Sequence, residues 1–114
     1  MKNKLNSFKD FITCAEFLKK ENISENITIH GGSAGGLLIG ASINISPDTF
    51  HCAVAEVPFV DVLNTILDDN LPLTPPEWEE WGNPIKNKSD FDYIFQPFNR
   101  DQLRYTFLKI LDYH

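Results

Sequence analysis

Long apolar runs and secretory features are missing from this sequence. No stretch reaches the roughly 18 consecutive apolar residues of a transmembrane helix, and the positively charged residues 1–7 have no apolar segment behind them. Basic residues are also scarce, with 10 Lys and Arg against 16 Asp and Glu and a net charge of −6. We therefore expect no membrane partner and no nucleic-acid partner, because both present anionic surfaces to a protein.

Cysteine is rare as well, and we expect no disulfide framework. The two cysteines, Cys14 and Cys52, lie in a helix-like and a strand-like apolar context. This placement favours buried free thiols in a reducing compartment, and we expect a cytoplasmic protein. Hydrophobic residues make up 42% of the chain, which is enough for a globular core.

The N-terminal half has a clear periodic pattern. Apolar residues at spacings of three and four predict an amphipathic helix over residues 6–20. β-branched residues predict a strand at 27–30, and a helix with almost no polar face is predicted from Leu37 to Ile43. The run HCAVAEV, residues 51–57, is typical of a buried parallel strand. This order is that of an α/β fold, with a parallel sheet flanked by helices.

The pattern loosens after Pro58. A short helix is predicted within 60–67, and a second helix begins near Thr74, with Thr74 as N-cap, proline in the first turn and glutamate at the third position. Gly82-Asn83-Pro84 is expected to end that helix. Its two tryptophans, Trp78 and Trp81, are interpreted as packing residues.

The junction between the first predicted strand and the following helix is rich in glycine. Gly31-x-Ser33-x-Gly35 has the spacing of a nucleophile elbow, in which a sharp strand-to-helix turn exposes a serine hydroxyl. Such a turn strains the serine backbone, and its neighbours need to lack side chains where strand and helix approach each other. The elbow glycines are Gly31, Gly32, Gly35 and Gly36. The pattern predicts Ser33 as a nucleophile on an α/β-hydrolase fold.

Two other interpretations of this junction stay open. A glycine-rich turn can bind phosphate at a helix N-terminus, but the known phosphate patterns are incomplete here: Leu37 stands after Gly36 where a P-loop has lysine, and Ser33 replaces the second glycine of the dinucleotide pattern. The glycines could also serve packing alone. Moreover, 114 residues with two convincing strands are too few for a whole α/β-hydrolase, so we expect a partial fold, truncated at both ends.

The wider sequence resembles a known family. The run GGSAGGLLIGASINISPDTFHCAVAEVPFVDVL, followed by EWEEWGNP, resembles the catalytic domain of the prolyl oligopeptidase family of serine peptidases, and within it the oligopeptidase B (protease II) subgroup. NSFKDFITCAEFLKKE is similar to the helix that precedes the elbow strand in that family. We interpret residues 1–97 as the central part of an α/β-hydrolase catalytic domain and residues 98–114 as a divergent C-terminal tail.

The resemblance implies a Ser–Asp–His peptidase that works without metal or cofactor and, in this subgroup, cleaves peptides after Lys or Arg. By position, Ser33 matches the nucleophile and the backbone N–H of Ala34 matches one oxyanion donor. Glu77 and Glu79 match two acidic residues that bind the basic side chain before the scissile bond, a task that suits carboxylates. The residues alone leave another interpretation open, in which Glu77 belongs to a capping box and Glu79 and Glu80 suit the positive end of the helix dipole.

The family's catalytic Asp and His lie beyond the matched region. His30 and His51 are interpreted as structural, and His114 as a terminal residue unsuited to catalysis. Because a serine hydroxyl without a base is a weak nucleophile, we expect a serine-peptidase piece that is inactive alone unless a complementary chain supplies Asp and His. The alternative is a non-enzymatic remnant or a small interaction module from a split gene.

Overall fold

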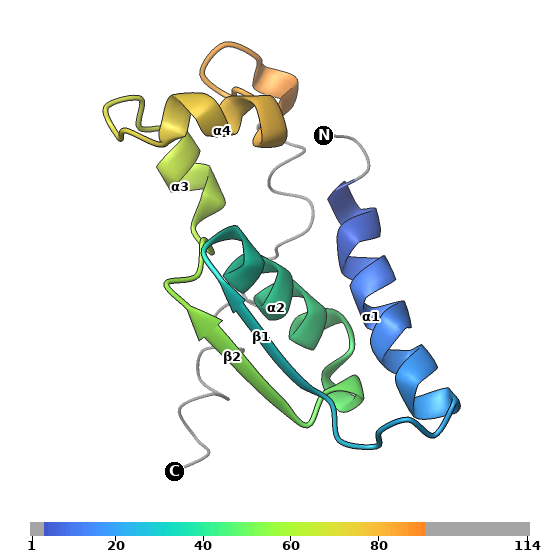
Figure 1. The fold of residues 1–114 in the computed structure, drawn as a ribbon. Coiled ribbons are helices and arrows are strands. Elements are labelled where there is room, and N and C mark those ends of the chain that lie inside the picture. The colour runs from blue at the N-terminus through green and yellow to red at the C-terminus, as the bar shows by residue number, and fades with distance from the viewer. Residues whose placement is uncertain (1–3, 91–114) are drawn as a thin grey trace.

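Two parallel strands and the helix between them form the centre of the fold (Figure 1). The computed structural model describes residues 4–90. Strand β1 (Thr28–Gly32) pairs with β2 (Cys52–Glu56) from Thr28 opposite Cys52 to Gly32 opposite Glu56. Helix α2 (Ala34–Ile45) and a single turn at Pro47–Thr49 connect them. This is the predicted α/β arrangement of a parallel sheet flanked by helices.

Helix α1 (Lys4–Lys20) packs beside α2, and these two helices lie on the same side of the sheet (Figure 1). The predicted helix 6–20 is therefore confirmed, beginning two residues earlier. Its buried residues Phe8, Ile12 and Ala15 recur at spacings of four and three, as expected for an amphipathic helix. Ala15 joins one core cluster with Ile27, Ile29 and Ile39.

A second cluster holds two short helices against the elbow end of α2. Helix α3 spans Val62–Ile66 and α4 spans Thr74–Trp81. Leu37 of α2 packs with Val62, Ile66 and Trp81, and these four side chains are at most 6% exposed. The short helix predicted within 60–67 is confirmed, and α4 ends just before Gly82, where the sequence predicted its end. Trp81 is a core residue, as expected.

The predicted burial of β2 is wrong. Cys52, Val54, Ala55 and Glu56 are exposed, and only Ala53 is partly covered. Within residues 4–90, β2 pairs with one strand only, and helices cover one of its two faces. The side chains on its other face therefore have nothing to pack against within these residues. Val54 is accordingly 43% exposed.

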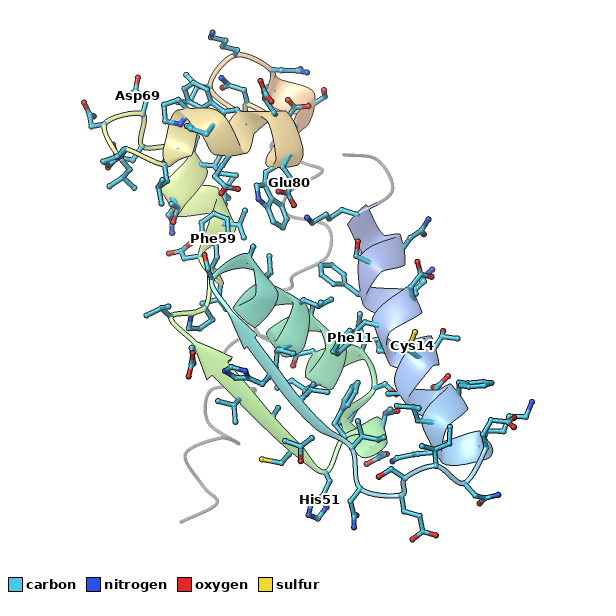
Figure 2. All side chains as sticks on the ribbon, viewed as in Figure 1. Phe11, Cys14, His51, Phe59, Asp69 and Glu80 are labelled. Atoms are coloured by element: carbon cyan, nitrogen blue, oxygen red, sulfur yellow. The ribbon has the colours of Figure 1, made fainter. Side chains whose placement is uncertain are left out.

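The two cysteines are exposed as well, against expectation. Cys52 opens β2, and Cys14 lies on α1 (Figure 2). Cys14 precedes the buried Ala15 by one residue, and one residue rotates a helix by about 100°, so the thiol leaves the buried stripe. In the part of the chain that the structure describes, no helix is long and apolar enough to cross a membrane.

Candidate active site

Ser33 is the single residue between β1 and α2. Its φ of 52° and ψ of −119° place it in a region that non-glycine residues rarely adopt. Such a backbone costs about 1–3 kcal/mol and persists only where its surroundings enforce it. The side chain is exposed and makes no capping hydrogen bond to α2, although Ser33 occupies the N-cap position. The hydroxyl is therefore presented outward and is not used to stabilise the helix.

Backbone hydrogen bonds hold Ser33 in this conformation from two sides. Its N–H donates to the carbonyl of Glu56 at 3.0 Å, and its own carbonyl accepts the N–H of Phe59 at 2.9 Å. Between these two partners, Val57 also has a positive φ, of 37°, and is 87% exposed. The end of β2 and the residues after it therefore fix the conformation of the Ser33 turn. Each of the two segments contains a non-glycine residue with a positive φ.

Two of the elbow glycines are required by close approach. A Cβ on Gly31 would lie 2.5 Å from the carbonyl oxygen of Gly35, and a Cβ on Gly36 would lie 2.7 Å from Cα of Pro58. The other two have more room: a Cβ on Gly35 would meet nothing within 4 Å, and one on Gly32 would make ordinary contact with Glu56. The elbow is therefore tightest at Gly31, where β1 meets the start of α2, and at Gly36, where α2 meets the segment that follows β2.

Ala34 begins α2 immediately after Ser33. The first N–H groups of a helix have no acceptor within the helix, and the helix dipole makes this end favourable for negative charge. The Ala34 N–H stays the predicted donor to an oxyanion formed at Ser33.

The two described histidines lie away from Ser33. His30 is three residues earlier on β1, about 10 Å along an extended strand. Its Nε2 lies 3.4 Å from Oε1 of Glu56, and both side chains are more than half exposed. The His51 N–H donates to the carbonyl of Ile27 at the opposite end of the sheet (Figure 2), about 20 Å from Ser33 along the strand. His114 lies outside the described residues.

The three carboxylates of α4 have different surroundings. Glu77 is half-buried, and its Oε2 accepts the indole N–H of Trp81 at 2.8 Å. Glu79 is exposed, and Glu80 forms an ion pair with Lys4 of α1. Glu77 and Glu79 are two residues apart, so they project from different faces of the helix.

The predicted helix cap at Thr74 is wrong, and so is the capping-box interpretation of Glu77. Thr74 is the first residue of α4, Leu73 occupies the N-cap position, and no side chain caps the helix. The Thr74 hydroxyl instead donates to the carbonyl of Thr65 at 2.9 Å, which ties α4 to α3. A tertiary hydrogen bond has replaced the local one.

Phe59 connects the acidic helix to the elbow, a link that sequence reasoning missed. Its N–H bonds to the Ser33 carbonyl, and its ring packs edge-on against Trp81 with centroids 5.9 Å apart. Figure 2 shows Phe59 between the elbow and α4, below Glu80. The sequence does contain a signal for this link: an aromatic residue follows closely after β2, the strand that ends beside the elbow. Among residues 4–90, no three metal-ligating side chains gather in one place.

The sequence model of the prolyl oligopeptidase family matches residues 1–110. The chain is 47% identical over 103 residues to Protease 2 of Moraxella lacunata, covering 87% of this chain and 15% of that protein. It is 43% identical over 106 residues to Dipeptidyl aminopeptidase BI of Pseudoxanthomonas mexicana, covering 90% of this chain and 14% of that protein.

Two solved structures match the chain at a sequence identity close to that of these relatives. Oligopeptidase B from Leishmania major superimposes with a TM-score of 0.74 at 48% identity, covering 82% of this chain and 13% of that chain. Oligopeptidase B from Trypanosoma brucei, in a closed form with covalently bound antipain, gives 0.69 at 52% identity, covering 76% of this chain and 12% of that chain. The fold described here is therefore part of an α/β-hydrolase fold.

The chain spans about one-seventh of the length of the curated relatives it matches. The family match extends past residue 97 into the segment 98–114, which lies outside the described residues, so the proposed division at 97 stays a prediction. The predicted resemblance is confirmed, and the chain belongs to the prolyl oligopeptidase family of serine peptidases.

Proposed function

We propose that this chain supplies the nucleophile of a serine-type peptidase, and that Ser33 is that nucleophile. The observation that supports this best is the strained backbone of the one residue between β1 and α2, whose hydroxyl is exposed and does not cap the helix. Strain of about 1–3 kcal/mol is retained where the strained conformation serves a function. The phosphate-binding and packing interpretations give no reason for a serine in this conformation.

The chemistry is acyl transfer. The Ser33 oxygen attacks the carbonyl carbon of the scissile bond while its proton passes to a histidine base, and the Ala34 N–H donates to the resulting oxyanion. The histidine then gives the proton to the leaving amine, and a serine ester remains. Water, deprotonated by the same base, hydrolyses this ester and restores the serine. Losing one oxyanion donor typically slows such reactions by about 10²–10³-fold.

Residues 4–90 do not activate Ser33 by themselves. The two histidines in this region lie about 10 and 20 Å away along the strands. We infer that the catalytic His and Asp come from outside these residues, in the same polypeptide or in a complementary chain, and that the 114-residue chain alone is inactive. The exposed edge strands of the sheet would pair with the strands that carry them.

The proposed substrates are peptides with Lys or Arg before the scissile bond. Glu77 and Glu79 would bind the basic side chain, and the net charge of −6 favours the approach of a cation. Glu77 is the ordered member of the pair, because Trp81 holds one of its oxygens. Glu79, which is exposed and projects from a different face of α4, adds a second negative charge to the same helix.

We place this activity in the cytoplasm. Both cysteines are free and exposed. Exposed thiols are retained most readily where the compartment keeps them reduced.

A chimera tests the proposal directly. Residues 4–90 would replace the matching segment of oligopeptidase B from Leishmania major. Hydrolysis of the C-terminal amide bond would then be measured in peptide amides that have Arg, Lys or norleucine before that bond. We expect cleavage after Arg and Lys, with a loss of several orders of magnitude in Ser33→Ala. Ser42→Ala, which removes a buried hydroxyl of α2, is the matched control and should retain activity. A folded chimera without Ser33-dependent cleavage would contradict the proposal and favour the interaction-module alternative.

A further inference from the structure

Helix α4 carries three acidic side chains, and each of them has different surroundings in the structure. Glu80 pairs with a cation, Lys4, so its charge is neutralised within the chain. The side chain of Glu79 is exposed and makes no hydrogen bond or ion pair within residues 4–90. Glu77 is held by an indole N–H, a neutral donor. A neutral donor orients a carboxylate and leaves its full negative charge available to a ligand.

The donor to Glu77 is itself rigid. Trp81 is 6% exposed, its ring packs edge-on against Phe59, and the Lys4 ammonium lies 4.2 Å from its ring centroid. These contacts hold the indole in one orientation, so the direction of its N–H is set before any ligand arrives. Lys4 also forms the ion pair with Glu80, so it links Trp81 to a second residue of α4.

We propose that Trp81 is a positioning residue for substrate recognition: its indole N–H holds Oε2 of Glu77, so that Oε1 is presented to the basic side chain of the substrate. This inference rests on the proposed role of Glu77. A carboxylate that is already oriented loses less rotational freedom on binding than a mobile one. The difference between Glu77 and Glu79 then lies in preorganisation, since both carry the same charge.

Trp78 provides a matched control on the same helix. Its indole N–H donates to the carbonyl of Ile66 at 3.1 Å, which is a bond to backbone and not to a carboxylate. Trp81→Phe and Trp78→Phe both remove one indole N–H and keep an aromatic ring. Only the first variant frees Glu77, so any shared loss of stability cancels in the comparison.

The experiment uses the full chain and its two indole N–H signals in a ¹⁵N NMR spectrum, one for each tryptophan. The two variants assign the signals. Glu77→Gln should shift the Trp81 signal and leave the Trp78 signal in place, because only Trp81 donates to Glu77. A Trp78 signal that keeps its position in Trp81→Phe shows that α4 remains packed.

Ligand binding is then measured with N-acetyl-arginine amide, with the uncharged N-acetyl-citrulline amide as comparison. We expect binding of the arginine amide to weaken about three- to tenfold in Trp81→Phe, the range expected when one side chain must be ordered on binding. Trp78→Phe should change it less than twofold. Equal affinity of Trp81→Phe and the unaltered chain, or an unmoved Trp81 signal in Glu77→Gln, would overturn the positioning role.

Failure of the recognition proposal has a different signature. If the unaltered chain binds the citrulline amide as well as the arginine amide, or binds neither, α4 is not a cation site and both proposals about it are wrong. The role of Ser33 would be untouched by that result, because the chimera tests it separately.

Discussion

The elbow and helix α4 place their candidate residues in different ways. At the elbow, backbone atoms do the positioning: backbone groups of Glu56 and Phe59 hold Ser33. Gly31 admits the close approach of α2, and Gly36 admits that of Pro58. On α4, side chains do it: the indole of Trp81, four residues from Glu77 on the same helix, and the ammonium of Lys4, 76 residues from Glu80. Both regions depend on the assembled fold, because Glu56 and Phe59 lie 23 and 26 residues after Ser33 and Lys4 lies 76 residues before Glu80. The difference is that backbone groups position Ser33, whereas side chains position the carboxylates of α4.

This difference has a consequence for substitution. The elbow should tolerate almost no added volume at its contact points, because backbone atoms cannot move aside. The acidic helix should tolerate changes of shape and respond to the loss of single polar atoms. The two regions can therefore be told apart by the kind of substitution that damages each.

The largest expected effect on stability is at the elbow glycines. Gly31→Ala would place a methyl group 2.5 Å from a backbone oxygen, and we expect a loss of about 3 kcal/mol in the free energy of unfolding. Gly35→Ala meets nothing within 4 Å and lies in α2, so it should be neutral or stabilise by up to about 1 kcal/mol. Urea unfolding of the two variants would measure the contrast, and equal effects would contradict the packing described at Gly31.

The next effect concerns recognition on α4. In the active chimera, Glu77→Gln should raise KM for arginine substrates by about tenfold or more, because a charge-assisted contact is replaced by a neutral one. Glu79→Gln should raise it less, since no side chain within residues 4–90 orders the Glu79 carboxylate. Steady-state kinetics with arginine and norleucine substrates would show this, and a larger effect at Glu79 would reverse the assignment.

A smaller effect is expected where α3 and α4 are joined. Thr74→Val keeps the shape of a side chain that is 1% exposed but leaves the Thr65 carbonyl without its donor. We expect a destabilisation of about 1–2 kcal/mol in urea unfolding. Ser42→Ala is the comparison, because the Ser42 hydroxyl is buried without a hydrogen-bond partner, and its removal should be neutral or stabilising. If Thr74→Val were neutral, the hydroxyl would not be what ties the two helices.

The smallest effect is expected at the surface of α4. Glu80→Gln removes an ion pair whose side chains are 26% and 52% exposed, and such pairs contribute at most about 1 kcal/mol. In the chimera it should leave KM for arginine substrates unchanged within twofold. A rise in KM as large as that of Glu77→Gln would mean that the three carboxylates act as one cluster.

The same contrast explains how much of the molecule could be predicted from its sequence. The order of helices and strands and the elbow follow from periodicity and turn chemistry, which are local. The burial of β2 was predicted wrongly, because an apolar strand does not reveal which neighbours it lacks. Thr74 was taken for a cap, because the Thr65 carbonyl that binds its hydroxyl is brought close only by the fold. The contact between Lys4 and Glu80 has no sequence signal at all.

Labelling with a fluorophosphonate serine-hydrolase probe tests the central claim most directly, namely that residues 4–90 build the elbow and that its base comes from elsewhere. The probe would be applied to the 114-residue chain, to the chimera, and to both with Ser33→Ala. We predict labelling of the chimera at Ser33 and none of the chain alone. Ser33-dependent labelling of the chain alone, or an unlabelled chimera, would contradict the claim.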